Sequence, residues 1–285
     1  LDSGAGNDSL LGGDGADTIL AGAGDDTIDS GTSNDSVNAG DGNDFVLSGD
    51  GNDTVDGGSG DDSILAGAGN DSINAGIGND TVNGGPGNDT LDGGSGVDLL
   101  DYSTDTSGVT VNLVTGTVTS TVSGTDVISN FENVTGGSGN DSITGSDAAN
   151  KIIGGSGVDT INAGAGDDWV LFDSNDATVD GGAGNDTLAI QTSSVDFTVI
   201  SDSKYIGFET LDLTNPIDVV GNQTVKLGLA DVMAFSSTSD ELKIHGDAGD
   251  TAILSGNWPV MGTQPVIYND GSTQQYVKLQ MTDPV

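Results

Sequence analysis

The sequence predicts an all-β protein, most of it a parallel β-roll in which short strands stack in successive coils. One observation is an Asp that recurs every nine residues, eleven times in succession, from Asp8 to Asp98. Another is the aliphatic residue that stands two places after each of these Asp residues, and a third is the content of 48 Gly. We divide the chain into a first roll (1–101), a β-rich insertion (102–135), a second roll (136–189) and a C-terminal β cap (190–285).

The first roll follows the frame G-G-x-G-x-D-x-U-x, where U is aliphatic, as in GGDGADTIL at 12–20 and GGSGDDSIL at 57–65. We expect each unit to form a six-residue turn, for which Gly supplies positive φ angles, followed by a three-residue strand. The sixth place of the frame is always acidic in this roll. It holds Asp8, Asp17, Asp26, Asp35, Asp44, Asp53, Asp62, Asp71, Asp80, Asp89 and Asp98.

Two units make one coil, and coils stack roughly 4.8 Å apart. Asp8 then lies over Asp26 on one side of the roll, and Asp17 lies over Asp35 on the other. Carboxylates at this spacing repel by about 1 kcal/mol in water and by several at an effective dielectric near 20. A hard cation that takes six to eight oxygen ligands removes this repulsion, and Ca²⁺ fits better than Mg²⁺, which demands tight octahedral geometry. Zinc lacks its preferred ligands.

We therefore predict that calcium folds the chain, since one aliphatic residue per unit buries less apolar surface than the ordering of a whole unit costs. Units two apart pair to give about 9 calcium sites in the first roll and up to about 4 in the second. Asn150 and Ala177 stand in the ligand column of the second roll and should weaken its sites. The remaining ligands there are Asp141, Asp159, Asp168 and Asp186.

Composition restricts the partners and the chemistry. A formal net charge of −40 predicts no binding to nucleic acid or anionic lipid. The chain has no Cys, which excludes disulfides and thiolate chemistry, and no apolar run is long enough to span a membrane. It lacks a basic and apolar leader and begins inside a repeat, so we expect it to be a fragment of a larger protein. His245 is the only histidine.

Less specific interpretations of the repeat fit it less well. A solvated acidic face is the usual explanation of acidic runs, but the strict period without counter-ions disfavours it. Third-place acids such as Asp14, Asp41 and Asp50 do fit surface solvation. Ice binding would need Thr in successive third places, and Thr32 alone among the eleven satisfies this.

The frame resembles the repeats-in-toxin (RTX) family, whose nonapeptide is a known calcium-binding repeat. The resemblance implies a β-roll, export through a type I secretion channel and folding on contact with external calcium. The segment FENVTGGSGNDSITG at 131–145, where the insertion meets the second roll, is similar to the re-entry into repeats in large RTX adhesins.

Beyond Ile190 the runs FTVI, ETLDL, TVKLGL, ELKIHG, DTAILSG and YVKLQM predict an antiparallel β cap, and LADVMAF predicts a short helix. The order of these segments resembles the C-terminal region of type I-secreted bacterial adhesins. That resemblance places the secretion signal in roughly the last fifty residues. Trp169 and Trp258 are expected to pack the second roll and the cap, although an exposed pair could bind sugar.

Our leading functional prediction is a calcium-binding, non-enzymatic module of a secreted or cell-surface RTX adhesin, extracellular or on the bacterial surface, with calcium ions and the type I secretion apparatus as partners. One alternative is the C-terminal roll of a secreted hydrolase or epimerase whose catalytic domain lies upstream. The chain itself contains neither HExxH nor a G-x-S-x-G elbow. Another alternative is a module that binds a surface glycan, a peptide or a protein.

Overall fold

The computed structural model describes residues 1–190, 192, 194–201, 203–213, 224–227, 241–246, 251–254, 266–269 and 275–280. The chain divides into two compact units. Unit 1 comprises Leu1–Thr144 with Gly154–Val158, and unit 2 comprises Gly145–Ile153 with Asp159–Val285. The predicted LADVMAF helix, Trp258 and the chain end after Gln280 lie outside the described residues.

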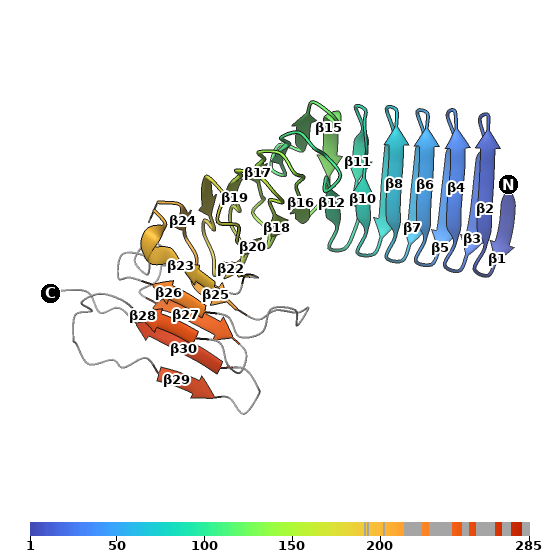
Figure 1. The fold of residues 1–285 in the computed structure, drawn as a ribbon. Helices are drawn as coiled ribbons and strands as arrows, with labels where there is room; N and C mark the ends of the chain where they lie inside the picture. Colours follow the sequence, from blue (N-terminus) through green and yellow to red (C-terminus); the bar gives the residue numbers. More distant parts are fainter. Residues whose placement is uncertain are drawn as a thin grey trace. The chain divides into compact units, whose positions relative to one another are not determined.

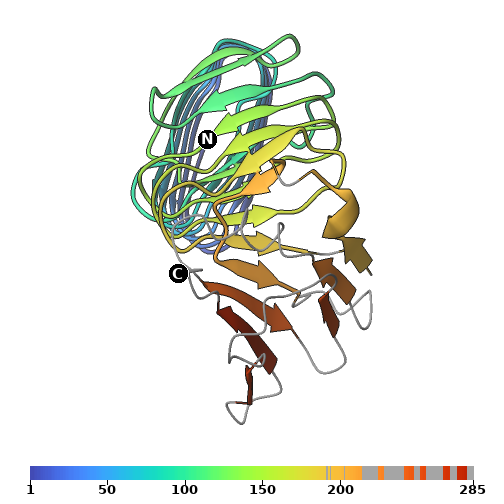
Figure 2. The same cartoon turned by 90° about the vertical axis from the view of Figure 1, so that its left-hand side faces the viewer.

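Unit 1 is a parallel β-roll, as the repeat predicted. Odd and even strands form two separate sheets, ordered β1-β3-β5-β7-β9-β11 and β2-β4-β6-β8-β10-β12 (Figure 1). The strands are β1 (Asp2–Ala5), β2 (Ser9–Asp14), β3 (Thr18–Ala23), β4 (Thr27–Thr32), β5 (Ser36–Asp41), β6 (Phe45–Asp50), β7 (Thr54–Ser59), β8 (Ser63–Ala68), β9 (Ser72–Ile77), β10 (Thr81–Asn83), β11 (Thr90–Asp92) and β12 (Leu99–Asp101). Figure 2 looks along this stack and shows the coils overlying one another.

The register confirms the predicted coil of two repeats. Ile19 pairs with Val37 across β3 and β5, and Leu10 pairs with Ile28 across β2 and β4, which is a step of two nine-residue units in each sheet. All side chains of the eighth place point between the sheets, where Ile19, Ile28, Ile64 and Leu91 are almost wholly buried. The aliphatic column is therefore the core of the roll.

The strands of β2 to β9 are longer than predicted. Each covers six residues, from the seventh place of one repeat to the third place of the next, so the expected three-residue strand was wrong for this part of the roll. Burial alternates along β3, where Ile19 and Ala21 face inward. The first place is thus a second core column, filled by Gly, Ala or Ser. Glycine in the second place allows neighbouring strands to stay paired through this part of the repeat. Gly22 lies opposite Gly40, and a Cβ on Gly22 would collide with the carbonyl oxygen of Gly4.

A polar column in the fifth place ties the turns together. The Oδ1 atom of Asn34 accepts the backbone N–H of Asn52 at 2.9 Å, and Asn52 accepts that of Asn70 at 2.7 Å. On the opposite side Asp25 accepts the N–H of Asn43 at 2.9 Å. These exposed Asn and Asp side chains accept hydrogen bonds from backbone amides of the turns, which the pairing between strands does not satisfy. This explains why Asn and Asp are common in the fifth place, which the frame leaves as any residue.

The insertion is an antiparallel meander built into one sheet. Its strands are β13 (Thr110–Asn112), β14 (Thr117–Ser120) and β15 (Gly124–Ser129), paired β13-β14 and β14-β15. The meander rejoins parallel stacking at both ends, because β15 pairs with β11 and β13 pairs with β17 (Ser142–Thr144). In the other sheet β16 (Asn133–Thr135) pairs with β12.

Unit 2 begins with further coils of the same kind. The strands β18 (Lys151–Ile153), β20 (Trp169–Leu171) and β22 (Thr187–Ala189) stack in one sheet, followed by β25 (Thr210–Asp212). The other sheet contains β19 (Thr160–Asn162), β21 (Thr178–Asp180) and β24 (Tyr205–Ile206). Trp169 is partly exposed, and the ammonium of Lys151 lies 5.0 Å from the centre of its ring.

The remaining strands of unit 2 correct the predicted antiparallel cap in two respects. In one sheet β23 (Ser194–Asp196), β26 (Thr224–Leu227) and β28 (Thr251–Leu254) pair in parallel. In the other, β27 (Glu241–Gly246) pairs in parallel with β25, and among the described strands of this region antiparallel pairing joins β27 with β30 (Gln275–Gln280) and β30 with β29 (Val266–Asn269). Coil stacking continues into this region, so parallel pairing continues with it.

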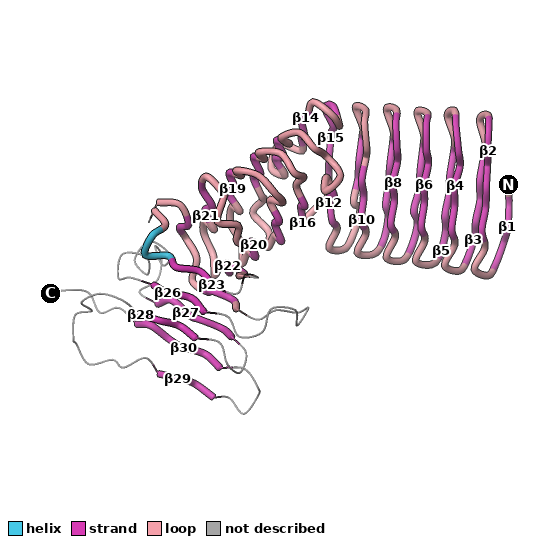
Figure 3. Tube along the Cα trace, viewed as in Figure 1, coloured by secondary structure: helices cyan, strands magenta, loops and turns pink. Residues whose placement is uncertain are grey.

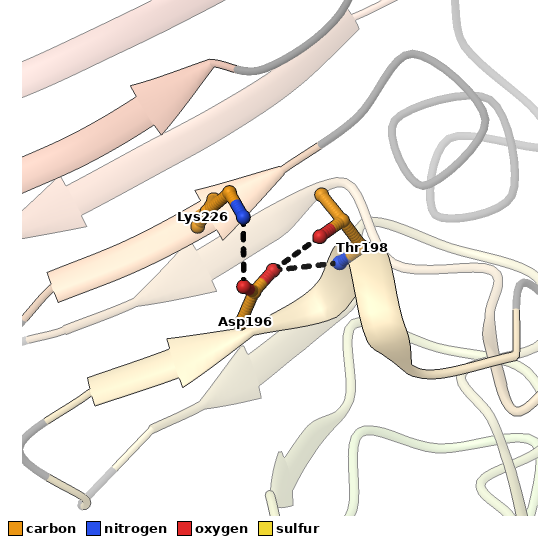
Figure 4. A network of polar contacts seen from close by, with 3 residues as sticks. All are labelled: Asp196, Thr198 and Lys226. Atoms are coloured by element: carbon orange, nitrogen blue, oxygen red, sulfur yellow. Dashed lines mark hydrogen bonds and ion pairs between the residues drawn. The ribbon is translucent and has the colours of Figure 1, made fainter.

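The run FTVI is not a strand, because Phe197–Val199 forms a 3-10 turn, drawn in cyan in Figure 3. Asp196 caps that turn by accepting the N–H of Thr198 at 3.1 Å as well as its hydroxyl (Figure 4). The second oxygen of Asp196 accepts Lys226 at 2.8 Å, an ion pair whose side chains are both more than one third exposed. Such a surface pair contributes little stability.

In the described part of the chain, no helix has the length and apolar character needed to cross a membrane.

Candidate calcium sites

The sixth-place Asp residues of unit 1 form two ladders of carboxylates, one at each turn side of the roll. In each ladder the Oδ1 atom of an Asp accepts the backbone N–H of the Asp one coil earlier. Nine such hydrogen bonds link the eleven Asp residues, with donor–acceptor distances of 2.7 to 2.9 Å. The first ladder is Asp8, Asp26, Asp44, Asp62, Asp80 and Asp98, and the second is Asp17, Asp35, Asp53, Asp71 and Asp89.

The other carboxylate oxygen of these residues has no hydrogen-bond donor. Within the described residues, the Oδ2 atom of every one of the eleven is buried and unpartnered. From Asp26 to Asp98 these side chains are at most 4 % exposed. A buried acceptor without a donor is costly, and a buried carboxylate is more so. The roll therefore contains a regular series of oxygens that protein groups leave unsatisfied.

Burial and mutual repulsion raise the pKa values of several ladder carboxylates. Desolvation raises the pKa of Asp62 and of Asp89 from 3.8 to about 7, the backbone hydrogen bond opposes this shift, and neighbouring carboxylates add to it. The same causes, with desolvation first, raise the pKa of Asp71 and of Asp98 to about 6. Repulsion from Asp80 and Glu132 contributes to the raised pKa of Asp98. Each ladder is thus an array in which the charged form needs a cation.

Calcium fits this donor set. The unsatisfied atoms are all hard oxygens, and backbone carbonyl oxygens lie close to them. At Gly57, for example, the carbonyl oxygen of Ala75 and the Oδ2 of Asp62 both lie against the point that a Cβ would occupy, so two acceptors converge there. Oxygen ligands of this kind suit Ca²⁺, which binds carboxylates and carbonyls in flexible geometry. A bound cation would neutralise the ladder charge and accept the lone pairs of the Oδ2 atoms.

Each ladder of unit 1 continues into an acidic residue that the sequence analysis did not assign. The first ladder continues to Glu132, whose Oε2 accepts the N–H of Asp98 at 2.8 Å. The second continues to Asp126, which accepts the N–H of Asp89 at 3.0 Å. Asp126 differs from the ladder residues before it because its Oδ2 accepts the buried hydroxyl of Tyr102 at 2.5 Å. A protein donor thus satisfies the oxygen that is bare elsewhere in the ladder.

Asp141, predicted as a ligand, has a different environment in unit 1. Its Oδ1 accepts the N–H of Val109 at 2.7 Å, and its Oδ2 accepts that of Gly137 at 2.9 Å. Thr110 pairs with Ser142, so Val109 holds the place equivalent to Asp141 on the preceding strand, and no carboxylate stands there. Protein donors reach both oxygens of Asp141, unlike those of the ladder residues from Asp8 to Asp98.

Unit 2 repeats the ladder on one side. Asp168 accepts the N–H of Asn150 at 2.7 Å, and Asp186 accepts that of Asp168 at 2.9 Å. Glu209 then accepts the N–H of Asp186 at 2.9 Å, in the place that Glu132 takes in unit 1. Among the described residues, the Oδ2 atoms of Asp168 and Asp186 are buried without a donor. Burial raises the pKa of Asp186 to about 7 and that of Asp168 to about 6.

On the other side of unit 2, Asp159 is wholly buried and Ala177 leaves the next sixth place without a carboxylate. Asp176, one residue earlier in the chain, is also buried, and desolvation raises its pKa to about 7. The repeat does not predict Asp176 as a ligand, because this residue stands in the fifth place and not in the sixth.

A signal for two of the missed residues was present in the sequence. Glu132 and Glu209 stand in the segments FENV and FETL, where each Glu precedes an aliphatic residue by two places, as the sixth-place Asp does. Asp126 has the same relation to Ile128. Their place in the ladders could be found by extending the D-x-U spacing to Glu and across the insertion.

The fold and these sites define a parallel β-roll with buried ladders of oxygen ligands. A family model for four copies of the RTX calcium-binding nonapeptide repeat matches residues 2–37, 29–64, 65–100, 135–170 and 173–189. These matches cover more than half of the chain, which belongs to the RTX calcium-binding repeat family and is a calcium-binding RTX module. No curated protein matches the sequence.

Proposed function

We propose that this chain is the calcium-folded module of a secreted or cell-surface RTX adhesin, which aids type I secretion and folds outside the cell. The observation that carries the proposal is the series of buried Oδ2 atoms without donors, within the described residues, from Asp8 to Asp98. A fold that buries so many bare carboxylate oxygens needs cations to be stable.

The repulsion between neighbouring carboxylates of a ladder can be calculated from their spacing. Carboxylates one coil apart, at roughly 4.8 Å, repel by about 1 kcal/mol in water and by about 3 to 4 kcal/mol at an effective dielectric of 20. Every interior member of a ladder has two such neighbours. Calcium bound between coils would turn these repulsions into attractions, so that the free energy of metal binding becomes free energy of folding.

In this proposal the ladder residues bind calcium ions and hold neighbouring coils together, and they neither form nor break covalent bonds. Each Asp would hold the coil before it through Oδ1 and offer Oδ2 to the ion. About 9 such steps stand in the first roll, and up to about 4 more are proposed in the second. We assign the chain no catalytic role, and we place any catalytic domain of an RTX hydrolase or epimerase elsewhere in its protein.

The dependence of folding on calcium would also assist export. A calcium-poor cytosol would keep the chain expanded and able to pass a type I channel, and calcium outside would fold each segment as it emerges. The charge of −40 supports this, because it favours an expanded chain until cations bind. Secretion measured with and without external calcium tests the idea, and equal rates would contradict it.

Adhesion is the role that we favour for the whole protein, with a surface glycan or protein as its partner. The supporting feature is the resemblance of the C-terminal region to RTX adhesins. The partly exposed Trp169, with Lys151 over its ring, is the described aromatic surface best suited to a sugar. The sequence upstream in the full-length protein distinguishes the roles: tandem β-sandwiches would support an adhesin, and a protease motif would support an enzyme.

The decisive experiment is a calcium titration of the metal-free chain followed by far-UV circular dichroism, with bound calcium counted by equilibrium dialysis on the same sample. We expect a cooperative gain of β-structure that saturates together with the bound metal. Full β-content in excess chelator would refute the proposal.

A further inference from the structure

The repeat frame fails in the coil of unit 2 that contains Ala177. Its turn reads FDSNDA where the frame requires G-G-x-G-x-D, so both the glycines and the sixth-place Asp are missing. Asp176 is nevertheless 2 % exposed, while Asn175 and Ala177 on either side are exposed. An acidic side chain is thus turned inward from the fifth place, which holds an exposed Asn or Asp in most other coils.

Asp176 takes over the hydrogen bond that a sixth-place Asp makes. In regular coils the ladder carboxylate accepts the N–H of the Asp one coil earlier, as Asp53 accepts that of Asp35 at 2.8 Å. Here the carboxylate of Asp176 accepts the backbone N–H of Asp159. The turn is shifted by one residue, because Ala177 donates its N–H to the oxygen of Asp159 at 2.7 Å, a bond that the seventh-place residue makes in regular coils, as Thr27 does to Asp8 at 2.9 Å. The strands resume the ordinary register after the turn, with Thr178 opposite Thr160.

The aromatic side chain of Phe172 explains why the turn changes. Phe172 occupies the inward-facing first place, where Gly, Ala or Ser stands in the regular coils, and packs against Phe197 and Tyr205 with ring centres 5.5 and 5.1 Å apart. The hydroxyl of Tyr205 donates to the carbonyl oxygen of Asp173, which also accepts the N–H of Asp176 at 3.2 Å. These contacts shape a tighter turn that presents Asp176 in place of residue 177.

The second oxygen of Asp176 is then bare. Its Oδ1 is buried and meets no hydrogen-bond donor among the described residues. The charges that act on it are the carboxylates of Asp159 and Asp173. The nearby cation does not relieve them, because the ammonium of Lys204 donates to the carbonyl oxygen of Ser174 at 2.7 Å and lies over the ring of Tyr205. The arrangement combines two buried carboxylates with a buried oxygen that no protein donor satisfies within the described residues.

We propose that Asp176 and Asp159 together hold a divalent cation of the calcium class, so that an out-of-frame carboxylate restores the site that Ala177 would abolish. The inference rests on the proposed calcium-dependent folding and extends it to a residue outside the repeat. Hard oxygen ligands and the absence of sulfur or histidine from this described cluster favour calcium over zinc.

The test counts calcium bound per chain, by equilibrium dialysis of the full chain against Ca²⁺, in four proteins. These are the unsubstituted chain, Asp176→Asn, the double variant Asp176→Asn/Ala177→Asp and the control Asp147→Asn, which changes an exposed Asp of the same unit. We expect Asp176→Asn to bind one calcium fewer, the control to bind the full number, and the double variant to remain one ion short, because residue 177 is exposed and does not take the place of Asp176.

An unchanged count in a folded Asp176→Asn chain overturns the assignment. If that variant does not fold at saturating calcium, the conservative variant Asp176→Glu, which keeps a carboxylate at the same position, decides: folding with the full count supports the site, and a lower count or a failure to fold overturns it. The proposed function fails by a different result, in which the unsubstituted chain binds no calcium or folds fully in chelator. An intact calcium response with an unchanged count in Asp176→Asn rejects this inference alone.

Discussion

Replacing Tyr102 by Phe should destabilise the first roll more than the loss of an ordinary hydrogen bond. The hydroxyl donates to Oδ2 of Asp126 at 2.5 Å, and both side chains are at most 1 % exposed. Desolvation and the adjacent carboxylate raise the pKa of Tyr102 far above its usual value, so the phenol remains a donor.

The expected magnitude follows from the charge of the acceptor. Hydrogen bonds to charged groups contribute about 1.5 to 3 kcal/mol, and neutral ones contribute about 0.5 to 1.5 kcal/mol. We expect Tyr102→Phe to lower the free energy of unfolding by about 2 kcal/mol, which is roughly 30-fold in the folding equilibrium. The matched control is Tyr205→Phe, because Tyr205 donates to the neutral carbonyl of Asp173 and should lose about 1 kcal/mol.

Urea denaturation at saturating calcium, followed by circular dichroism, measures both losses. A loss in Tyr102→Phe no larger than that in Tyr205→Phe would refute the reasoning, since it would mean that the buried carboxylate does not depend on the phenol.

Three further predictions concern the aliphatic core, calcium binding by the ladders and the protonation of the ladder carboxylates. Ile64→Ala, at a side chain 1 % exposed, should lower the free energy of unfolding in calcium by about 2 to 5 kcal/mol, whereas Leu11→Ala, at one 69 % exposed, should change it little; equal losses in urea denaturation would contradict the proposed core. Asp62→Asn should reduce the calcium counted by dialysis, because Asp62 belongs to two steps of its ladder, and the exposed Asp14→Asn should leave the count unchanged; a full count in Asp62→Asn would exclude this residue as a ligand. In chelator, protons should partly replace calcium. The pKa of Asp62 and of Asp89 is higher in the folded chain than the ordinary 3.8, so stability from these groups is fully present below that value and is lost as the pH rises through about 7. Circular dichroism in chelator should therefore show more β-structure at about pH 4 than at about pH 8, and the reverse order would contradict the pKa shifts.

The periodic sequence determined the coil and its ladders. A strict nine-residue repeat brings identical residues into line, so the parallel register, the buried aliphatic column and the alignment of Asp8 with Asp26 all follow from spacing. The length of the strands did not follow, because a Gly pair is typical of turns. Stacked coils let glycine main chains pair closely, and the strand continues through them.

Only the tertiary structure decided where the regular pattern ends and what replaces it. Tyr102 meets Asp126 across 24 residues of chain, and Asp176 turns inward because Phe172 packs on rings that come from a later segment. These contacts join residues with no common spacing, so no repeat can reveal them. The sequence determines a calcium ladder wherever the period holds, and where the period breaks, side-chain packing between distant segments decides which carboxylate remains bare.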